Sequence, residues 1–308
     1  MSTVWNKESM PDCSDKTVVI TGASSGIGLE TAIAMAEKNA TLVLAVRNME
    51  KGKEALVKVK AIKPSVRAEL MKLDLADLDS VRTFAAAYTQ KYPTLDILVN
   101  NAGIMNTPYR LTTDGFESQF GSNHLGHFAL TGLLLPHLIS TPASRIVTLS
   151  SIAAHNASID FKNLDGAKGY NSWRFYGQSK LANMLFAREL NNQLTKGGLS
   201  TVSVVCHPGF SNTNLMSFGS GKRANPLMRL LTYLGTQPAN MGALPTLYSA
   251  TSPLIKGGEY IGPDGRGGRK GHPKSDSIIN KLYDVDVSRR LWEVSEQLTG
   301  VTFSLDPK

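Results

Sequence analysis

Residues 21–28 read Thr21-Gly22-Ala23-Ser24-Ser25-Gly26-Ile27-Gly28, and this stretch decides the fold. It joins an apolar run at 16–21, typical of a strand, to a segment at 26–38 whose apolar residues recur at helical period. Glycine lets the chain turn tightly and approach a ligand, and free N–H groups at a helix start attract phosphate. The spacing is not that of G-x-G-x-x-G, so an ordinary strand–helix turn is the alternative. The glycines and serines favour a dinucleotide-binding turn, with expected contacts at Gly22, Ser24, Ser25, Gly26, Ile27 and Gly28.

Strand-like and helix-like segments alternate along the rest of the chain. Further strands are expected at 41–46, 67–73, 95–100, 145–150 and 201–207. Helices are expected at 49–63, 77–91, around 116–138, at 173–196 and at 277–298, and a turn-rich basic loop at 262–274. This succession predicts an α/β fold: a doubly wound, mostly parallel sheet (a Rossmann fold) in three αβα layers. We expect a single Rossmann-fold domain at 16–300 with a lid around 210–240, an N-terminal tail at 1–15 and a C-terminal tail at 301–308.

Composition restricts the class of protein. The chain has 308 residues, 42% of them hydrophobic and 19% charged, which is enough to form a sizeable core. Its net charge is +8, but the basic residues are scattered without aromatic interleaving, so we expect no nucleic-acid partner. Two cysteines, Cys13 and Cys206, and a polar start without a signal peptide indicate the cytoplasm. The longest apolar stretch, 130–139, contains Pro136 and is too short for a transmembrane segment. A homo-oligomer is left open.

The end of the second expected strand indicates which dinucleotide binds. Folds of this type that bind NAD place an acid about 20 residues beyond the glycines, to bind the ribose 2′-hydroxyl. Here that position falls in Ala45-Val46-Arg47-Asn48, which has no acid. The Arg47 guanidinium can pair with a 2′-phosphate. We therefore expect NADP(H) rather than NAD(H), with Arg47 and Asn48 as contacts; the alternative is that Arg47 is an ordinary solvated residue.

The ends of the third and fourth expected strands should lie at the same edge of the sheet. Asp74 and Leu75 end the third, where Asp74 would reach the adenine or, alternatively, cap the next helix. Asn101, Ala102 and Gly103 follow the fourth strand, and small residues there would let the backbone approach the adenine ribose.

The reacting end is expected around Tyr176 and Lys180, which are spaced i, i+4 and so share a helix face. A nearby ammonium favours phenolate and would lower the tyrosine pKa. Ser151, or Ser150 if the register differs by one, ends the fifth strand and could donate to a carbonyl; a cap is the alternative. Asn123 lies within an expected helix, which its propensity disfavours, so either a function or a buried polar partner should explain it.

Two histidines on the same stretch raise the question of a metal. His124 and His127 are spaced i, i+3, but no cluster of further ligands accompanies them. We therefore expect both to be packing residues and expect no metal site.

Taken together, these residues resemble the short-chain dehydrogenase/reductase family over about 16–299. The segments 45–48, 123–128 and 176–183 resemble its retinol dehydrogenase and WW-domain oxidoreductase branch. The interval from Ser151 to Tyr176 is longer than in many members, although insertions here occur in that branch. The chain also lacks the N-terminal apolar segment of many relatives, which weakens a direct transfer of retinoid specificity.

The resemblance implies a role for each matching residue. Tyr176 would be the general acid in carbonyl reduction and the base in alcohol oxidation. Lys180 would bind the nicotinamide ribose and lower the Tyr176 pKa, Ser151 would polarise the carbonyl, and Asn123 would hold a water that links Lys180 to solvent. Contacts to the nicotinamide carboxamide and pyrophosphate would come from Pro208, Gly209 and Thr213.

The expected function is an NADP(H)-dependent oxidoreductase for an apolar aldehyde, ketone or alcohol, retinal-like or other. The apolar pocket would be walled by the lid residues Leu215, Met216, Phe218, Leu227, Met228, Leu230, Leu231 and Leu234, for which ordinary core is an equal alternative. One rival function is an NADP(H)-sensing regulator without turnover. Another is a peripheral lipid-surface dehydrogenase that uses the lid, Lys222-Arg223 and the basic residues 266–270.

Overall fold

Eight strands form one mostly parallel sheet in the computed structural model, which describes residues 4–211 and 236–305. The strand order is β3-β2-β1-β4-β5-β6-β7-β8, and only the β7–β8 pair is antiparallel within these residues. The strands are β1 (Thr17–Thr21), β2 (Thr41–Val46), β3 (Ala68–Lys72), β4 (Ile97–Asn100), β5 (Arg145–Leu149), β6 (Val202–Cys206), β7 (Tyr260–Pro263) and β8 (Pro273–Ser275). The predicted doubly wound α/β fold is confirmed.

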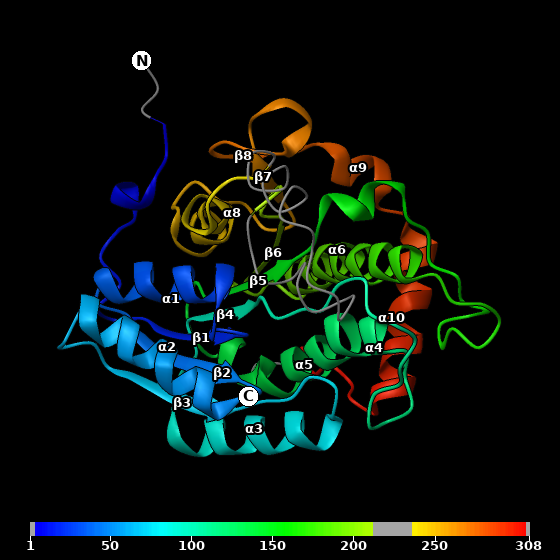
Figure 1. The fold of residues 1–308 in the computed structure, drawn as a ribbon, viewed down its shortest axis with the longest axis horizontal. Coiled ribbons are helices and arrows are strands. Elements are labelled where there is room, and N and C mark those ends of the chain that lie inside the picture. The colour runs from blue at the N-terminus through cyan, green and yellow to red at the C-terminus, as the bar shows by residue number, and fades with distance from the viewer. Residues whose placement is uncertain (1–3, 212–235, 306–308) are drawn as a thin grey trace, which may run out of the picture.

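Helices cover both faces of this sheet (Figure 1). On one side lie α1 (Gly26–Glu37), α2 (Met49–Ile62) and α8 (Ala239–Thr251). On the other lie α3 (Leu78–Lys91), α5 (Gly126–Ile139), α6 (Ser172–Lys196) and α10 (Val285–Thr299). The shorter helices are η1 (Lys7–Ser9), α4 (Ser118–Phe120), η2 (Gly121–Leu125), η3 (Ile152–Asn156), η5 (Arg266–Gly268) and α9 (Ile278–Leu282). Among the described residues, no helix is both long and apolar enough to cross a bilayer.

The strands are apolar on both faces because both faces are covered. In β1, Val18 and Ile20 pack toward α1 and α8, while Val19, between them, packs toward α3 and α5. All three side chains are fully buried. Near-continuous apolar runs of this kind are what a parallel sheet between two helix layers requires.

Several expected elements differ from those in the structure. The helix expected around 116–138 is α4, a π-helical turn η2 and α5 in succession. The helix expected at 277–298 is split into α9 and α10, because the Asp284 side chain caps the amides of Asp286 and Val287 and starts a new helix. The basic loop expected at 262–274 contains the end of β7 and the start of β8.

Among the strands and the longer helices of the described residues, α8, β7 and β8 were not expected, and neither were the short helices η1 and η3. The proposed lid at 210–240 lies mostly outside the described residues, together with Thr213, Lys222-Arg223 and the eight apolar residues assigned to its wall. In the segments expected to be tails, Met10, Cys13 and Val301 are buried against the rest of the protein.

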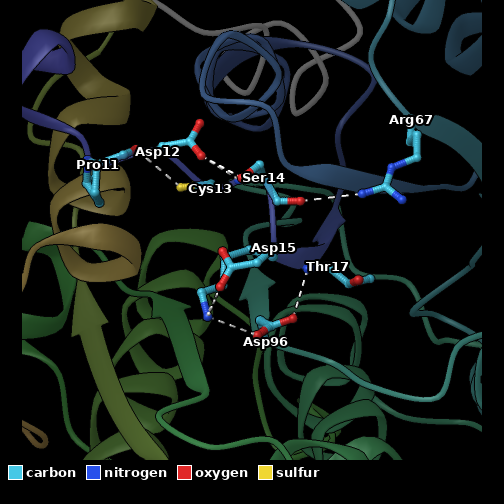
Figure 2. A network of polar contacts seen from close by, with 9 residues as sticks. Pro11, Asp12, Cys13, Ser14, Asp15, Thr17, Arg67 and Asp96 are labelled. Atoms are coloured by element: carbon cyan, nitrogen blue, oxygen red, sulfur yellow. Dashed lines mark hydrogen bonds and ion pairs between the residues drawn. The ribbon is translucent and has the colours of Figure 1, made fainter.

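A network of polar contacts ties the N-terminal segment to the amino end of the sheet (Figure 2). The Asp96 carboxylate accepts from the Thr17 amide at 2.9 Å and from Lys16 Nζ at 3.3 Å. Arg67 donates to the Ser14 carbonyl at 3.4 Å. Asp96 therefore fixes where β1 begins relative to β4, two strands whose opposite ends form the candidate site.

Replacing Asp96 with Ala should lower the free energy of unfolding by about 1–3 kcal/mol, because the Thr17 amide loses its acceptor beside a buried strand. Asp15→Ala is a matched control: Asp15 is also 3.3 Å from Lys16, but its side chain is 73% exposed. Its loss should change stability by less than about 0.5 kcal/mol. Urea denaturation followed by tryptophan fluorescence measures both, and equal losses would contradict the assignment.

Candidate active site

The site begins where β1 and β4 lie side by side and the strand order reverses. The connection after β1 leads to β2 on one side, and the connection after β4 leads to β5 on the other side. This divergence opens a crevice at the carboxyl ends of β1 and β4. The amino end of α1 points into this region. Its N-cap residue, Ser25, makes no side-chain capping bond, so the first amides of the helix are available to an anion.

Glycine is required at three positions of this turn. Gly22 has φ +67° and Gly26 has φ +56°, both in the left-handed region. Gly28 is helical, but a Cβ there would lie 2.5 Å from Asn101 Nδ2 and 2.6 Å from the Gly22 carbonyl oxygen. The backbone of α1 thus approaches the end of β4 more closely than any side chain permits.

The Thr21 hydroxyl locks the two strand ends together. Its oxygen accepts from the Asn101 and Ala102 amides, both at 2.9 Å. The Asn101 side chain donates in turn to the Thr21 carbonyl at 2.7 Å. This role of Thr21 was not predicted from the sequence, although a threonine at the end of an apolar strand was a signal for it.

The adenosine end has a different character. The Arg47 side chain is exposed just beyond β2, and Asn48 caps α2 by accepting from the Lys51 amide at 3.0 Å. Asp74 accepts from the Ala76 amide at 3.0 Å, beside the buried Leu75. The N-cap of α3 is Asp77, so the alternative that Asp74 caps this helix is wrong.

The structure brings Tyr176, Lys180 and Ser151 together. Tyr176 and Lys180 lie on α6 with exposures of 5% and 4%. Lys180 Nζ lies 6.0 Å from the Tyr176 ring centre and donates to the Leu149 carbonyl at 3.2 Å. Ser151 caps η3, and its hydroxyl interacts with the Tyr176 phenol. Ser150 instead donates to the Lys180 carbonyl at 2.7 Å, so Ser151 holds the position facing the phenol.

Burial controls the protonation of this pair. It raises the pKa of the Tyr176 phenol above the usual 10.0, and the Ser151 hydroxyl offsets this in part. Burial also lowers the pKa of Lys180 to about 8. In the protein alone, burial thus determines the direction of the Tyr176 pKa shift. The lowering expected from Lys180 together with an oxidised nicotinamide stays a prediction. The resting tyrosine is a protonated donor at neutral pH.

Asn123 lies in the π-helical turn η2, which explains a polar residue inside a helical stretch. Its Oδ1 accepts from the Ile104 amide at 2.8 Å, and its Nδ2 donates to Ser179 Oγ at 2.9 Å. Ser179 Oγ donates to the Tyr176 carbonyl at 2.8 Å. A Cβ on Gly103 would lie 3.3 Å from both Asn123 Oδ1 and Lys180 Nζ, so the chain after β4 passes close to both side chains.

Pro208 and Gly209 lie at the carboxyl end of β6, on the same edge of the sheet. The Pro208 carbonyl accepts from Ser211 Oγ at 2.7 Å and from Gln237 Nε2 at 2.9 Å. Gly209 has φ +62° and could not carry a side chain, since a Cβ would lie 2.3 Å from the Arg269 carbonyl. The last predicted contact, Thr213, is outside the described residues.

Comparisons with known proteins agree with this geometry. The family described as short chain dehydrogenase matches residues 16–222. Retinol dehydrogenase 14 of Mus musculus is 39% identical over 299 residues, covering 93% of this chain and 86% of the relative. Retinol dehydrogenase 11 of Homo sapiens is 39% identical over 293 residues, with 93% and 86% covered.

Solved structures show the same fold. An uncharacterized protein from Mycobacterium Paratuberculosis has a TM-score of 0.80 at 40% identity, covering 98% of this chain and 100% of that one. A short chain dehydrogenase from Shigella flexneri complexed with NADP has a TM-score of 0.64 at 21% identity, covering 82% and 98%. The chain belongs to the short-chain dehydrogenase/reductase family, whose members are oxidoreductases for CH–OH and C=O groups. Within that family it is similar to the retinol dehydrogenases along most of its length.

Gly28→Ala should weaken NADPH binding by about tenfold or more, because the new methyl group displaces Asn101 from Thr21 and distorts the turn. Gly197→Ala is the control, since a Cβ there would make only ordinary contacts from 3.4 Å outward. Fluorescence titration with NADPH measures both. Unchanged affinity in the Gly28 variant would show that this turn does not hold the nucleotide.

Proposed function

We propose that this protein is an NADP(H)-dependent oxidoreductase that interconverts an apolar aldehyde or ketone with its alcohol. The observation that supports this most is that Tyr176, Lys180 and Asn123 are buried together, with the half-buried Ser151 beside the phenol. Gly103, just beyond β4, lies close to both Asn123 Oδ1 and Lys180 Nζ, and this places the group next to the glycine-lined crevice. A regulator that only senses the nucleotide would have no use for a protonated phenol held beside a serine hydroxyl.

The crevice fits a nicotinamide dinucleotide. The uncapped start of α1 suits the pyrophosphate, and the absence of a Cβ at Gly22 and Gly28 lets this turn pack closely against Asn101 and Ala102 beyond β4. Arg47 would pair with a 2′-phosphate, and the Shigella flexneri relative in fold was solved with NADP. Asp74 and Leu75 would border the adenine, while Asn101, Ala102 and Gly103 would border its ribose. Pro208 and Gly209 would lie toward the carboxamide.

When bound, the nicotinamide supplies or accepts the hydride at the substrate carbon. Ser151 donates to the carbonyl oxygen and holds it against the phenol, which increases the polarisation of the C=O bond. In reduction, Tyr176 gives its proton to that oxygen, and in oxidation it removes the proton of the alcohol. Lys180 holds the ribose and provides the positive charge that stabilises the phenolate. Asn123 fixes the segment at 103–104 and, through Ser179, the turn of α6 that carries Tyr176.

The substrate side supports an apolar ligand. Trp173 lies one turn before Tyr176 on α6, with ring centres 6.5 Å apart in an edge arrangement. It is 57% exposed, which is unusual for so large an apolar side chain beside a buried tyrosine. An apolar carbonyl compound bound against Tyr176 would cover the indole. The relatives named as retinol dehydrogenases act, by name, on a substrate of this character.

Tyr176→Phe should lower kcat for carbonyl reduction by about 10²- to 10⁴-fold and leave NADPH affinity within about twofold, because only the proton donor is lost. A panel of apolar aldehydes and ketones, followed by NADPH absorbance, measures turnover. Tyr88→Phe is the matched control: Tyr88 is also buried but donates to the Thr94 carbonyl, far from the site. Full activity in the Tyr176 variant would refute the mechanism, and no wild-type turnover across the panel would favour the sensing regulator.

Arg47→Asp should reduce kcat/KM with NADPH by about tenfold or more and narrow or reverse the preference over NADH, because a charge-assisted phosphate contact becomes repulsive. Arg67→Asp is the charge-matched control, since Arg67 is also exposed but precedes β3 at the other end of the sheet. Equal use of both nucleotides by the wild-type protein would contradict NADP(H) specificity.

A further inference from the structure

His127 connects the two halves of the site through both of its ring nitrogens. It lies in the first turn of α5 and is 1% exposed. Its Nδ1 is 2.9 Å from the Asn123 carbonyl oxygen, and its Nε2 is 2.9 Å from Thr21 Oγ1. One contact therefore lies in the π-helical turn beside Tyr176, and the other lies at the end of β1, where the dinucleotide-binding turn starts.

The partners determine the tautomer of the ring. A carbonyl oxygen can only accept, so Nδ1 must carry the proton and Nε2 is an acceptor. The Thr21 hydroxyl lies 2.9 Å from Nε2 and 3.3 Å from the Val99 carbonyl, and the shorter contact assigns its proton to Nε2. This leaves the Thr21 oxygen to accept from the Asn101 and Ala102 amides, as observed. Burial lowers the pKa of His127 to about 4, and the nearby Lys180 charge acts in the same direction. The ring is therefore neutral at physiological pH and its donor–acceptor polarity is fixed.

We propose that His127 is a positioning residue that holds the dinucleotide-binding turn and the proton-transfer residues in register. This rests on the proposed function. Toward the nucleotide, the Thr21 hydroxyl that His127 accepts from also holds the Asn101 and Ala102 amides. Gly22 packs against Ala102, and Gly28 packs against the Asn101 side chain. Toward the substrate, the Asn123 peptide carries the side chain that binds Ile104 and Ser179.

An ordinary core histidine would make different contacts, and His124 is an example in the same chain. His124 is one turn earlier and also 1% exposed. Its Nε2 contacts Ser295 Oγ on α10 at 2.9 Å, and its Nδ1 has no hydrogen-bond partner among the described residues. Its side-chain hydrogen bond among the described residues is this one to α10, away from Thr21 and from the Asn123 carbonyl. Thus two buried histidines in the successive helical segments η2 and α5 differ in that only the His127 side chain bonds to both halves of the site.

Two substitutions separate the two bonds of His127. Asn places an amide N–H close to the position of Nδ1, so His127→Asn retains donation to the Asn123 carbonyl and loses Thr21. Gln places its carbonyl oxygen near the position of Nε2, so His127→Gln retains acceptance from Thr21 and loses Asn123. The same substitutions at His124 are the controls for the loss of a buried ring. Circular dichroism and Tm verify that each variant folds.

We expect the two substitutions to impair different steps, nucleotide binding in one case and turnover in the other. His127→Asn should raise the Kd for NADPH by about fivefold or more, the equivalent of one hydrogen bond, with kcat at saturating NADPH nearly retained. His127→Gln should lower kcat by a similar factor with Kd for NADPH nearly retained. The His124 variants should lower Tm and change neither parameter selectively.

The proposal would be overturned if Kd and kcat changed together in both His127 variants. It would also be overturned if Tm fell while Kd and kcat stayed the same. If the wild-type protein turned over no carbonyl substrate, the proposed function would fail by itself. The NADPH titrations would still decide the role of His127, because equal affinity in His127→Asn and wild type would overturn the coupling.

Discussion

The close contact between the carboxyl ends of β1 and β4 is the constraint on which the rest of the site depends. The Asn101 carboxamide donates to the Thr21 carbonyl, and the helix that follows β1 packs against that carboxamide with no room for a Cβ at Gly28. The same chain continues from Asn101 to Gly103, which lies close to both Asn123 and Lys180. A single backbone junction therefore fixes both the turn that would receive the pyrophosphate and the place where the reacting groups lie.

Burial determines which of the buried groups at the site hold a proton at rest. A tyrosine with 5% exposure keeps its proton, and a lysine with 4% exposure has a pKa of about 8 with one carbonyl as its hydrogen-bond partner. Desolvation disfavours the charged form of each. The phenol therefore becomes a base only when another positive charge enters the crevice, as an oxidised nicotinamide would provide. Without that charge, the site is prepared to donate a proton, which is the requirement for carbonyl reduction.

The sequence predicted those elements in which local pattern and tertiary environment agree. β2 matches its prediction at both ends because an apolar, β-branched run lies between clear turns. The elements that were not predicted have local sequences that disfavour them. The helix α8 contains Pro245, and the strands β7 and β8 are short and contain prolines. In the site, the residues at the strand ends could be proposed from the sequence alone. The protonation of Tyr176 was not, because its burial depends on helices that are distant in the sequence.

The two sides of the site also differ in how they are encoded. The side proposed for the nucleotide is a turn whose backbone packs against the end of the next strand, and only glycine fits at its crowded and left-handed positions, so its signature is visible in a short motif. The substrate side is formed by side chains brought together from several elements, and no spacing rule identifies them. Trp173 is the exception, because it lies on the same helix as Tyr176 and one turn away. Its ring is held 6.5 Å from the Tyr176 ring by one turn of the same helix. If the proposed function holds, a ligand at the phenol would therefore meet an indole whose position is fixed by the helix that carries the proton donor.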